Sequence, residues 1–144
     1  MIAGIPLPAT DDPLEQGFWK GLRAGALLIQ RCVHCEHWYF PPRRLCSGCH
    51  CSLEWTQVSG RGRIWSYTAV HPPVLTAFAP YVPYCVAIVE LEESESLRFA
   101  GNVLRSSAGQ INEVGVAELH IDRAVEAVIR PLAAGVLWPH WRLV

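Results

Sequence analysis

Four cysteines in two C-x-x-C pairs are the residues best suited to chemistry in this chain of 144 residues. The first pair lies in Cys32-Val33-His34-Cys35 and the second in Cys46-Ser47-Gly48-Cys49. Two such pairs can supply four thiolates to one tetrahedral metal, and their spacing is typical of a structural zinc ribbon. Because four protein ligands leave no coordination position for water or substrate, the zinc would stabilise the fold and the function must lie elsewhere.

Two alternatives stay open at this site. His50 and Cys51 directly follow the second pair, and either could offer a different metal ligand. The four cysteines could also hold iron or act as a redox dithiol. Zinc is the preferred interpretation, because paired C-x-x-C sequences in a cytoplasmic protein bind metal more often than they form disulfides.

The remaining candidates for catalysis do not form a catalytic set. Cys85 stands within an apolar segment, where a buried cysteine acts as a small hydrophobic residue. The acidic residues of positions 90–95 fall at a strand end and a turn, and Gly60-Arg61-Gly62 lacks the helix that a phosphate-binding loop needs. The sequence therefore predicts a chain that is not an enzyme by itself.

Composition restricts the choice of partners. The net charge is −1 and the pI is near 6.6, which argues against a strongly basic nucleic-acid-binding protein. The charge is uneven, since residues 20–63 carry seven basic side chains and two acidic ones. The first residues lack the features of a signal peptide, and no segment has the roughly 18 apolar residues of a membrane helix, so we expect a cytoplasmic protein.

The hydrophobic pattern predicts one short helix followed by β-structure. Asp12-Pro13-Leu14-Glu15 has the residues of a helix start, and Gly25 is a plausible end. Apolar and alternating segments then predict strands over 26–31, 63–71, 84–91, 97–103, 124–130 and 136–143. In the strand over 63–71 we expect Ile64, Ser66, Thr68 and Val70 on one face and Trp65, Tyr67, Ala69 and His71 on the other. About five strands after the ribbon indicate a small antiparallel barrel, of which the OB-fold is the commonest five-stranded case.

Several motifs occur together in an order that resembles a known family. They are Phe18-Trp19-Lys20-Gly21-Leu22, the two cysteine pairs, Phe40-Pro41-Pro42-Arg43, the Glu54–Gly62 segment and Trp65-Ser66-Tyr67-Thr68. The chain resembles the zinc-ribbon/OB-fold proteins long catalogued as a domain of unknown function and associated with acyl-CoA enzymes. It departs from their pattern at His50 and at Asp122, where relatives usually have glycine.

The resemblance implies a mainly β fold in three parts. These are an N-terminal arm and helix over 1–27, a rubredoxin-like zinc ribbon over 28–54 with Cys32, Cys35, Cys46 and Cys49 as metal ligands, and a C-terminal OB-fold over 55–144. It also implies a non-catalytic accessory subunit that binds and stabilises a thiolase-fold enzyme, either a thiolase or a retro-aldolase of steroid or lipid side chains. An acyl-CoA thioester would be the substrate of that hetero-oligomeric complex, at its interface.

Two surfaces are candidates for these contacts. The partner interface is expected at the aromatic and basic residues of the helix and ribbon, namely Phe18, Trp19, Trp38, Tyr39, Phe40 and Arg43. Contact with an acyl-CoA or another ligand is expected at Arg61, Arg63, Trp65 and Tyr67. Two alternative functions use similar residues: a partner subunit of a hotdog-fold enoyl-CoA hydratase, and an OB-fold that binds single-stranded nucleic acid through stacking aromatics. The near-neutral charge disfavours nucleic acid, and no membrane partner is expected.

Overall fold

The N-terminal helix is positioned by its cap and by one buried face. The computed structural model describes residues 1–144. The carboxylate of Asp12 accepts a hydrogen bond from the Leu14 amide (2.9 Å) and starts a 3₁₀ turn, Pro13–Glu15, that continues into α1, Gln16–Arg23. The helix stops before Gly25, whose φ of 76° is accessible to glycine at little cost. The predicted start and end of this helix are therefore confirmed.

The ribbon is built on a small antiparallel sheet. Its strands are β1 (Leu28–Cys32), β2 (Trp38–Tyr39) and β3 (Leu53–Gln57), in the order β2-β1-β3. The helix packs closely against this sheet, because a Cβ at Gly17 would lie only 2.1 Å from the ring of Trp55. We expected the ribbon to end at residue 54. Strand β3 continues past that residue, so the ribbon sheet extends to Gln57.

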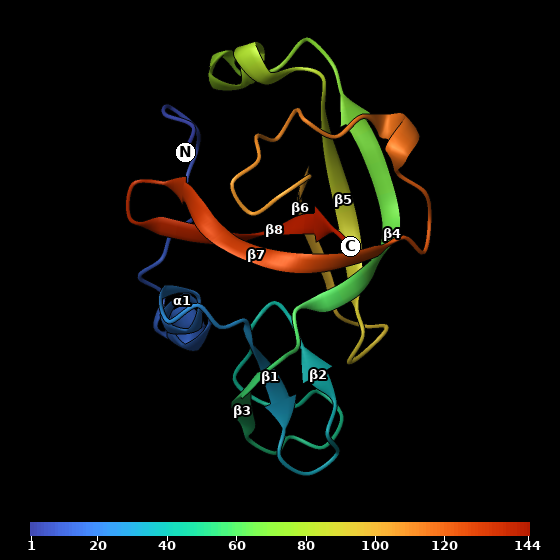
Figure 1. The fold of residues 1–144 in the computed structure, drawn as a ribbon. Helices are drawn as coiled ribbons and strands as arrows, with labels where there is room; N and C mark the ends of the chain where they lie inside the picture. Colours follow the sequence, from blue (N-terminus) through green and yellow to red (C-terminus); the bar gives the residue numbers. More distant parts are fainter.

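The second half of the chain forms a closed five-stranded barrel, which Figure 1 shows above the ribbon. Its strands, in the order β4-β5-β6-β8-β7, are β4 (Arg61–Val70), β5 (Tyr84–Leu91), β6 (Arg98–Leu104), β7 (Ala124–Ala133) and β8 (Val136–Leu143). The predicted mainly β fold with a five-stranded OB barrel is confirmed. One pairing, β6 with β8, is parallel, because the β7–β8 hairpin inserts between β6 and β4. None of the helices has the length and apolar character needed to cross a membrane.

A β-bulge in β4 changes which side chains face the barrel interior. Ile64 pairs with Val89 and Ser66 pairs with Ile88, so Trp65 is an extra residue without a partner on β5. The bulge moves the following side chains to the opposite face. Ile64 is buried and Tyr67 packs against the same core, whereas Trp65 is 47 % exposed on the outside. The predicted assignment of Tyr67 and Trp65 to one face was therefore wrong.

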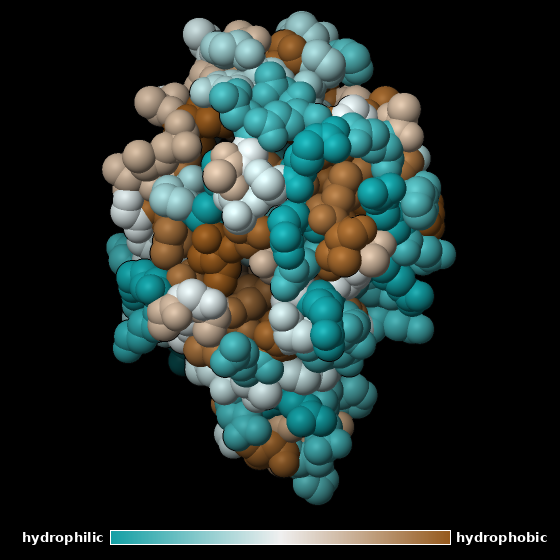
Figure 2. Space-filling model, in the orientation of Figure 1, coloured by the Kyte–Doolittle hydropathy of each residue, from teal (hydrophilic) through white to brown (hydrophobic).

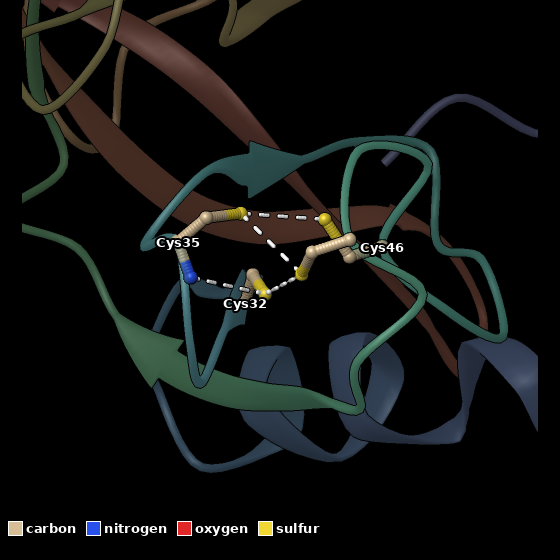
Figure 3. A group of neighbouring side chains, drawn as sticks. Cys32, Cys35 and Cys46 are labelled. Atoms are coloured by element: carbon tan, nitrogen blue, oxygen red, sulfur yellow. Dashed lines mark hydrogen bonds between the residues drawn. The ribbon is translucent and has the colours of Figure 1, made fainter.

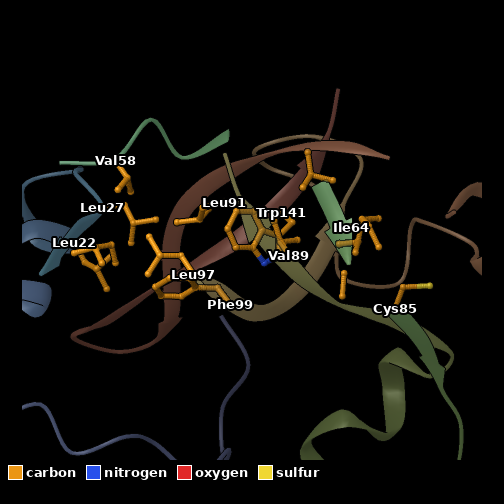
Figure 4. Packing of buried hydrophobic residues seen from close by; sticks show 14 of the residues in the cluster. Leu22, Leu27, Val58, Ile64, Cys85, Val89, Leu91, Leu97, Phe99 and Trp141 are labelled. Carbon is orange, nitrogen blue, oxygen red and sulfur yellow. The ribbon is translucent and has the colours of Figure 1, made fainter. Parts of the chain in front are cut away.

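One hydrophobic core joins helix, ribbon and barrel. Leu22 and Leu27 lie beside Leu97 and Phe99, while Trp141 lies within the barrel (Figure 4). The link between ribbon and barrel is held by two hydrogen bonds, from the Val58 amide to the Leu27 carbonyl (3.0 Å) and from the Ser59 amide to a Glu93 carboxylate oxygen (2.6 Å). The ribbon is therefore packed on the barrel by side chains and by its linker.

Candidate metal centre

The four cysteines predicted as ligands converge at the end of the ribbon. Their sulfur atoms all lie within 4.8 Å of one another, and all four thiols are free (Figure 3). Sulfur–sulfur distances are 3.4 Å for Cys32–Cys49, 3.4 Å for Cys35–Cys46 and 3.8 Å for Cys35–Cys49. A tetrahedron with Zn–S bonds of about 2.3 Å needs sulfur atoms roughly 3.8 Å apart. The donor set therefore fits a zinc ion held by four thiolates.

Local hydrogen bonds favour the thiolate form at two of the four sulfurs, Cys32 and Cys46, whereas contact with neighbouring thiols raises the pKa of Cys35 and Cys49. The backbone amides of His34 and Cys35 point at the Cys32 sulfur, at 3.4 and 3.5 Å. The hydroxyl of Tyr39 donates to the Cys46 sulfur at 3.0 Å, and this bond is the largest of several hydrogen bonds that lower the pKa of Cys46 to about 5. A thiol with a lowered pKa is available as the thiolate that binds zinc.

Sequence reasoning did not identify two residues that contact the sulfurs. Besides Tyr39, whose hydroxyl was overlooked, the Nδ1 atom of His37 lies 3.1 Å from the Cys35 sulfur. Because a metal-bound thiolate carries no hydrogen, this ring nitrogen would be the donor. The signal was available, since both residues stand between the cysteine pairs and carry a hydrogen-bond donor.

His50 and Cys51 do not join the sulfur cluster. The His50 amide donates to the Cys46 carbonyl (2.9 Å) and the Cys46 amide donates to the Cys51 carbonyl (3.0 Å), so both residues close the second turn through their backbone. The His50 side chain is exposed and its φ is 58°. Glycine adopts this backbone conformation most easily, so a histidine at this position carries a backbone cost.

Cys85 has the environment of a structural residue. It is 2 % exposed, its thiol donates to the Val114 carbonyl (3.3 Å), and burial raises the pKa of the thiol. A buried thiol with a raised pKa is a poor nucleophile. The expectation that Cys85 is a buried small residue is confirmed.

The aromatic residues expected at the partner interface lie in different places in the fold. Phe18 and Trp19 are 2 % and 4 % exposed, so their inclusion in a partner interface was wrong: both side chains are buried in the chain's own core. Phe40 packs against Phe18 and Phe99, with ring centroids 5.3 and 4.0 Å away. Tyr39 points to the cysteines instead, because neighbouring residues of a strand face opposite sides. The aromatic residues of the ribbon therefore do not form one continuous patch.

Two arginines stacked on aromatic rings complete this surface. Arg31 lies over the Trp38 ring, with 5.2 Å from its Cζ to the centroid, and Arg43 lies over the Tyr39 ring at 4.7 Å. Such cation–π contacts fix long side chains at the surface. Arg43 thus remains exposed, whereas Trp38 is half-buried and also packs against the core.

The four residues expected to contact a ligand do not meet at one site. Arg61 makes a bidentate contact with Glu92, and Arg63 pairs with Glu90 at 2.9 Å. These hydrogen bonds lower the pKa of both carboxyl groups and raise the pKa of both guanidinium groups. Trp65 lies outside the barrel under Arg98, whose Cζ is 4.0 Å from the ring centroid, while Tyr67 packs toward the core.

The comparisons with known proteins agree with this arrangement. Residues 19–52 match the family model of the ChsH2 rubredoxin-like zinc ribbon domain, and residues 55–130 match that of the ChsH2 C-terminal OB-fold domain. The chain belongs to the ChsH2 family. The zinc-ribbon match and the four converging sulfurs together support structural zinc in this family member.

Curated relatives extend the match along most of the chain. A DUF35 domain-containing scaffold protein of Methanocaldococcus jannaschii is 32 % identical over 115 residues, which cover 78 % of this chain and 74 % of that protein. A probable enoyl-CoA hydratase alpha subunit of Thermomonospora curvata is 37 % identical over 95 residues, 64 % of this chain but only 28 % of the subunit. Among solved structures, the Ltp2-ChsH2(DUF35) aldolase has a similar fold, with a TM-score of 0.78 at 23 % identity over 94 % of this chain and 98 % of the matched chain.

Proposed function

We propose that the chain is a non-catalytic accessory subunit that binds and stabilises a thiolase-fold enzyme acting on acyl-CoA thioesters. Membership of the ChsH2 family supports this function, and so do the names of relatives and neighbours: a scaffold protein, a hydratase subunit and an aldolase. The partner would be a thiolase or a retro-aldolase of lipid or steroid side chains. The chain's role would be to dock on that enzyme and hold its shape.

One exposed aromatic side chain on the barrel carries the proposal. Trp65 is 47 % exposed, and the bulge that places it outside also leaves it without a partner on β5. Arg98 covers one face of its ring and Ile88, 36 % exposed, belongs to the adjacent β5. Tryptophan and arginine are the residue types most often found at the centre of protein interfaces. Two strands of the barrel, β4 and β6, present them here, which reduces the ordering cost of association.

In Figure 2 hydrophobic residues form several patches over the barrel half, separated by hydrophilic ones. Because Trp65 and Ile88 are exposed on the paired strands β4 and β5, we place the docking surface on the outer face of these two strands and call it the Trp65 surface. Trp38 and Arg43 of the ribbon are secondary contacts in this proposal.

The acyl-CoA thioester is assigned to the complex. Arg61 and Arg63, the nearest candidates for its phosphates, already neutralise Glu92 and Glu90 in this chain. The negative charge of the paired carboxylate opposes the approach of a phosphate to either guanidinium. The partner enzyme would therefore supply the principal CoA contacts and all of the catalytic groups.

Co-purification with the thiolase-fold enzyme encoded beside this chain tests the proposal. We expect a stable hetero-oligomer, and enzyme activity and solubility that fall when this chain is omitted. Trp65→Ala should weaken the complex by about 30-fold, since removing a central aromatic residue costs on the order of 2 kcal/mol. Leu75→Ala is the matched control, because Leu75 is 56 % exposed but lies outside β4 and β5. A monodisperse chain that leaves the enzyme's activity and solubility unchanged would refute the proposal.

A hydratase partner is the second candidate. It is favoured by the Thermomonospora curvata subunit, in which the matched region is 28 % of a longer protein. The same co-purification with a neighbouring hotdog-fold hydratase separates the two candidates, because only the true partner should co-elute and depend on Trp65.

A further inference from the structure

A small cavity opens at the side of the barrel, away from the cysteines. It has a volume of about 240 Å³, and its walls come from the N-terminal arm, the 3₁₀ turn Thr76–Tyr81, the loop after β6 and the β7–β8 hairpin. The arm is fixed there by a hydrogen bond from the Ile2 amide to the Leu132 carbonyl, and Figure 1 shows it beside the hairpin. Ile2, Phe78, Ile111 and Leu132 give the cavity an apolar part.

The charge of this cavity is entirely positive. No acidic side chain lines it, and the one charged side chain in its wall is Arg130. Arg130 is half-buried and forms no ion pair within the chain; its Nη1 donates to the Gly109 carbonyl and its other N–H groups have no protein partner. A partly buried cation without a counter-charge is costly, and an anion offsets that cost.

Other polar groups around the cavity also lack partners. His140 is 5 % exposed, its Nδ1 lies 3.1 Å from the Trp138 carbonyl, and its Nε2 makes no hydrogen bond within the chain. The side-chain amides of Asn102 and Gln110, which also line the cavity, form no hydrogen bonds with the protein. His140 is buried, Asn102 is half-buried and Gln110 is exposed, so these groups are free to bind a polar ligand that enters the cavity.

The larger cleft of the molecule differs in each of these respects. It has a volume of about 500 Å³ and is lined by Arg61 and Arg63 together with the carboxylates of Glu90, Glu92 and Glu95. Both arginines there are already paired with carboxylates. An anion would therefore meet repulsion in the larger cleft and attraction in the smaller cavity.

We infer that the cavity around Arg130 and His140 binds a small organic carboxylate with a short apolar tail. The carboxylate accepts hydrogen bonds from the free N–H groups of Arg130 and from the amide of Asn102 or Gln110. The tail packs against Phe78, Ile111 and Leu132. This site lies on the chain itself and is independent of the partner enzyme proposed above.

A titration of the zinc-loaded chain with sodium butyrate tests the site, followed by ¹H–¹⁵N NMR at constant ionic strength. We expect saturable shifts of the amide signals of Asn102, Gln110, Arg130 and His140, with a dissociation constant of the order of 1 mM, as suits a ligand of this size. Butyramide, which has the same shape without the charge, should bind at least about 10-fold more weakly, because hydrogen bonds to charged groups contribute about 1.5–3 kcal/mol.

Two variants make the test specific. Arg130→Gln should weaken butyrate binding by about 10-fold or more, whereas Arg61→Gln, in the acid-lined cleft, should leave it unchanged. Equal responses to butyrate and butyramide, shifts that do not saturate, or full binding by Arg130→Gln would each overturn the inference. If Arg130→Gln does not fold, the comparison of butyrate with butyramide on the unmodified chain still decides it.

Discussion

The ring of Phe40 in the ribbon lies against the ring of Phe99 on β6, with centroids 4.0 Å apart. Phe18 of α1 contacts both rings, at 5.3 Å from Phe40 and 6.4 Å from Phe99. Three aromatic residues from helix, ribbon and barrel thus meet at one point. The ribbon is held against the barrel by these rings as well as by the linker, so we expect it to unfold together with the barrel.

The first prediction concerns this aromatic contact. Phe40→Ala should lower the free energy of unfolding of the zinc-loaded chain by about 2 kcal/mol, below the roughly 3–5 kcal/mol of a fully buried Phe→Ala change, because Phe40 is half-buried. Denaturant unfolding measures the loss, and amide hydrogen exchange should show that in this variant, unlike the unmodified chain, the ribbon opens before the barrel. Leu45→Ala, at an exposed ribbon residue, is the control and should change stability by less than about 0.5 kcal/mol. Equal stabilities of the two variants would contradict the packing argument.

The second prediction concerns the metal. The purified chain should contain one zinc per molecule, and chelation should unfold the ribbon, because the metal's binding free energy stabilises the folded state. Cys46→Ser should abolish stoichiometric zinc and lower the melting temperature, as measured by elemental analysis and thermal unfolding. Cys51→Ser is the control, since Cys51 lies outside the sulfur cluster. Loss of zinc in Cys51→Ser would show that the ligand set differs from the four clustered cysteines.

The third prediction concerns acid stability. Glu90 is almost fully buried between Arg63 and Arg98, and the hydrogen bond from Arg63 holds the pKa of Glu90 below its ordinary value of 4.5. A carboxyl group whose pKa is lower in the folded state stabilises the fold above the unfolded-state pKa. This contribution is lost as the pH falls from 4.5 through the folded pKa. Glu90→Gln should therefore be less stable at neutral pH and should lose less stability on acidification.

Urea unfolding between about pH 3 and pH 7 measures this dependence. Glu95→Gln is the control, because the Glu95 carboxylate forms no ion pair. If the stability of Glu90→Gln falls with acid as steeply as that of the unmodified chain, Glu90 does not cause the acid sensitivity.

Much of the fold could be predicted because its signals are local. Strands β5 and β8 begin and end at the predicted residues, since apolar runs bounded by turns define them. The exposure of Trp65 could not be read from alternation, because a bulge is set by pairing with β5 and not by β4 alone. The burial of Phe18 and Trp19 also depends on tertiary packing: the pattern showed that they need a surface to pack against, and that surface proved to be this chain's own core.

The metal centre was predictable and the ligand surface was not. Cysteine spacing directly limits which sulfurs can meet, so the four ligands were identifiable from the sequence. Arg61 and Arg63 carry no sequence signal that they pair with Glu92 and Glu90, residues some 30 positions away in β5 and the turn that follows it. The sequence also gives no sign that Arg130 lacks an ion-pair partner, because this depends on all of its neighbours in the folded chain.

The fourth prediction uses the backbone at His50. A non-glycine residue at positive φ costs about 1–2 kcal/mol, and His50 has a φ of 58° with an exposed side chain that makes no hydrogen bond. His50→Gly should relieve this cost, but glycine also gains freedom in the unfolded chain, so the net gain in unfolding free energy should be about 0.5 kcal/mol. His34→Gly, at an exposed position of the first cysteine pair without positive φ, should give no gain. Denaturant unfolding of both zinc-loaded variants measures the difference, and zinc content should stay unchanged in His50→Gly because its side chain is not a ligand. A loss of zinc in His50→Gly would instead identify His50 as a zinc ligand and contradict the backbone explanation.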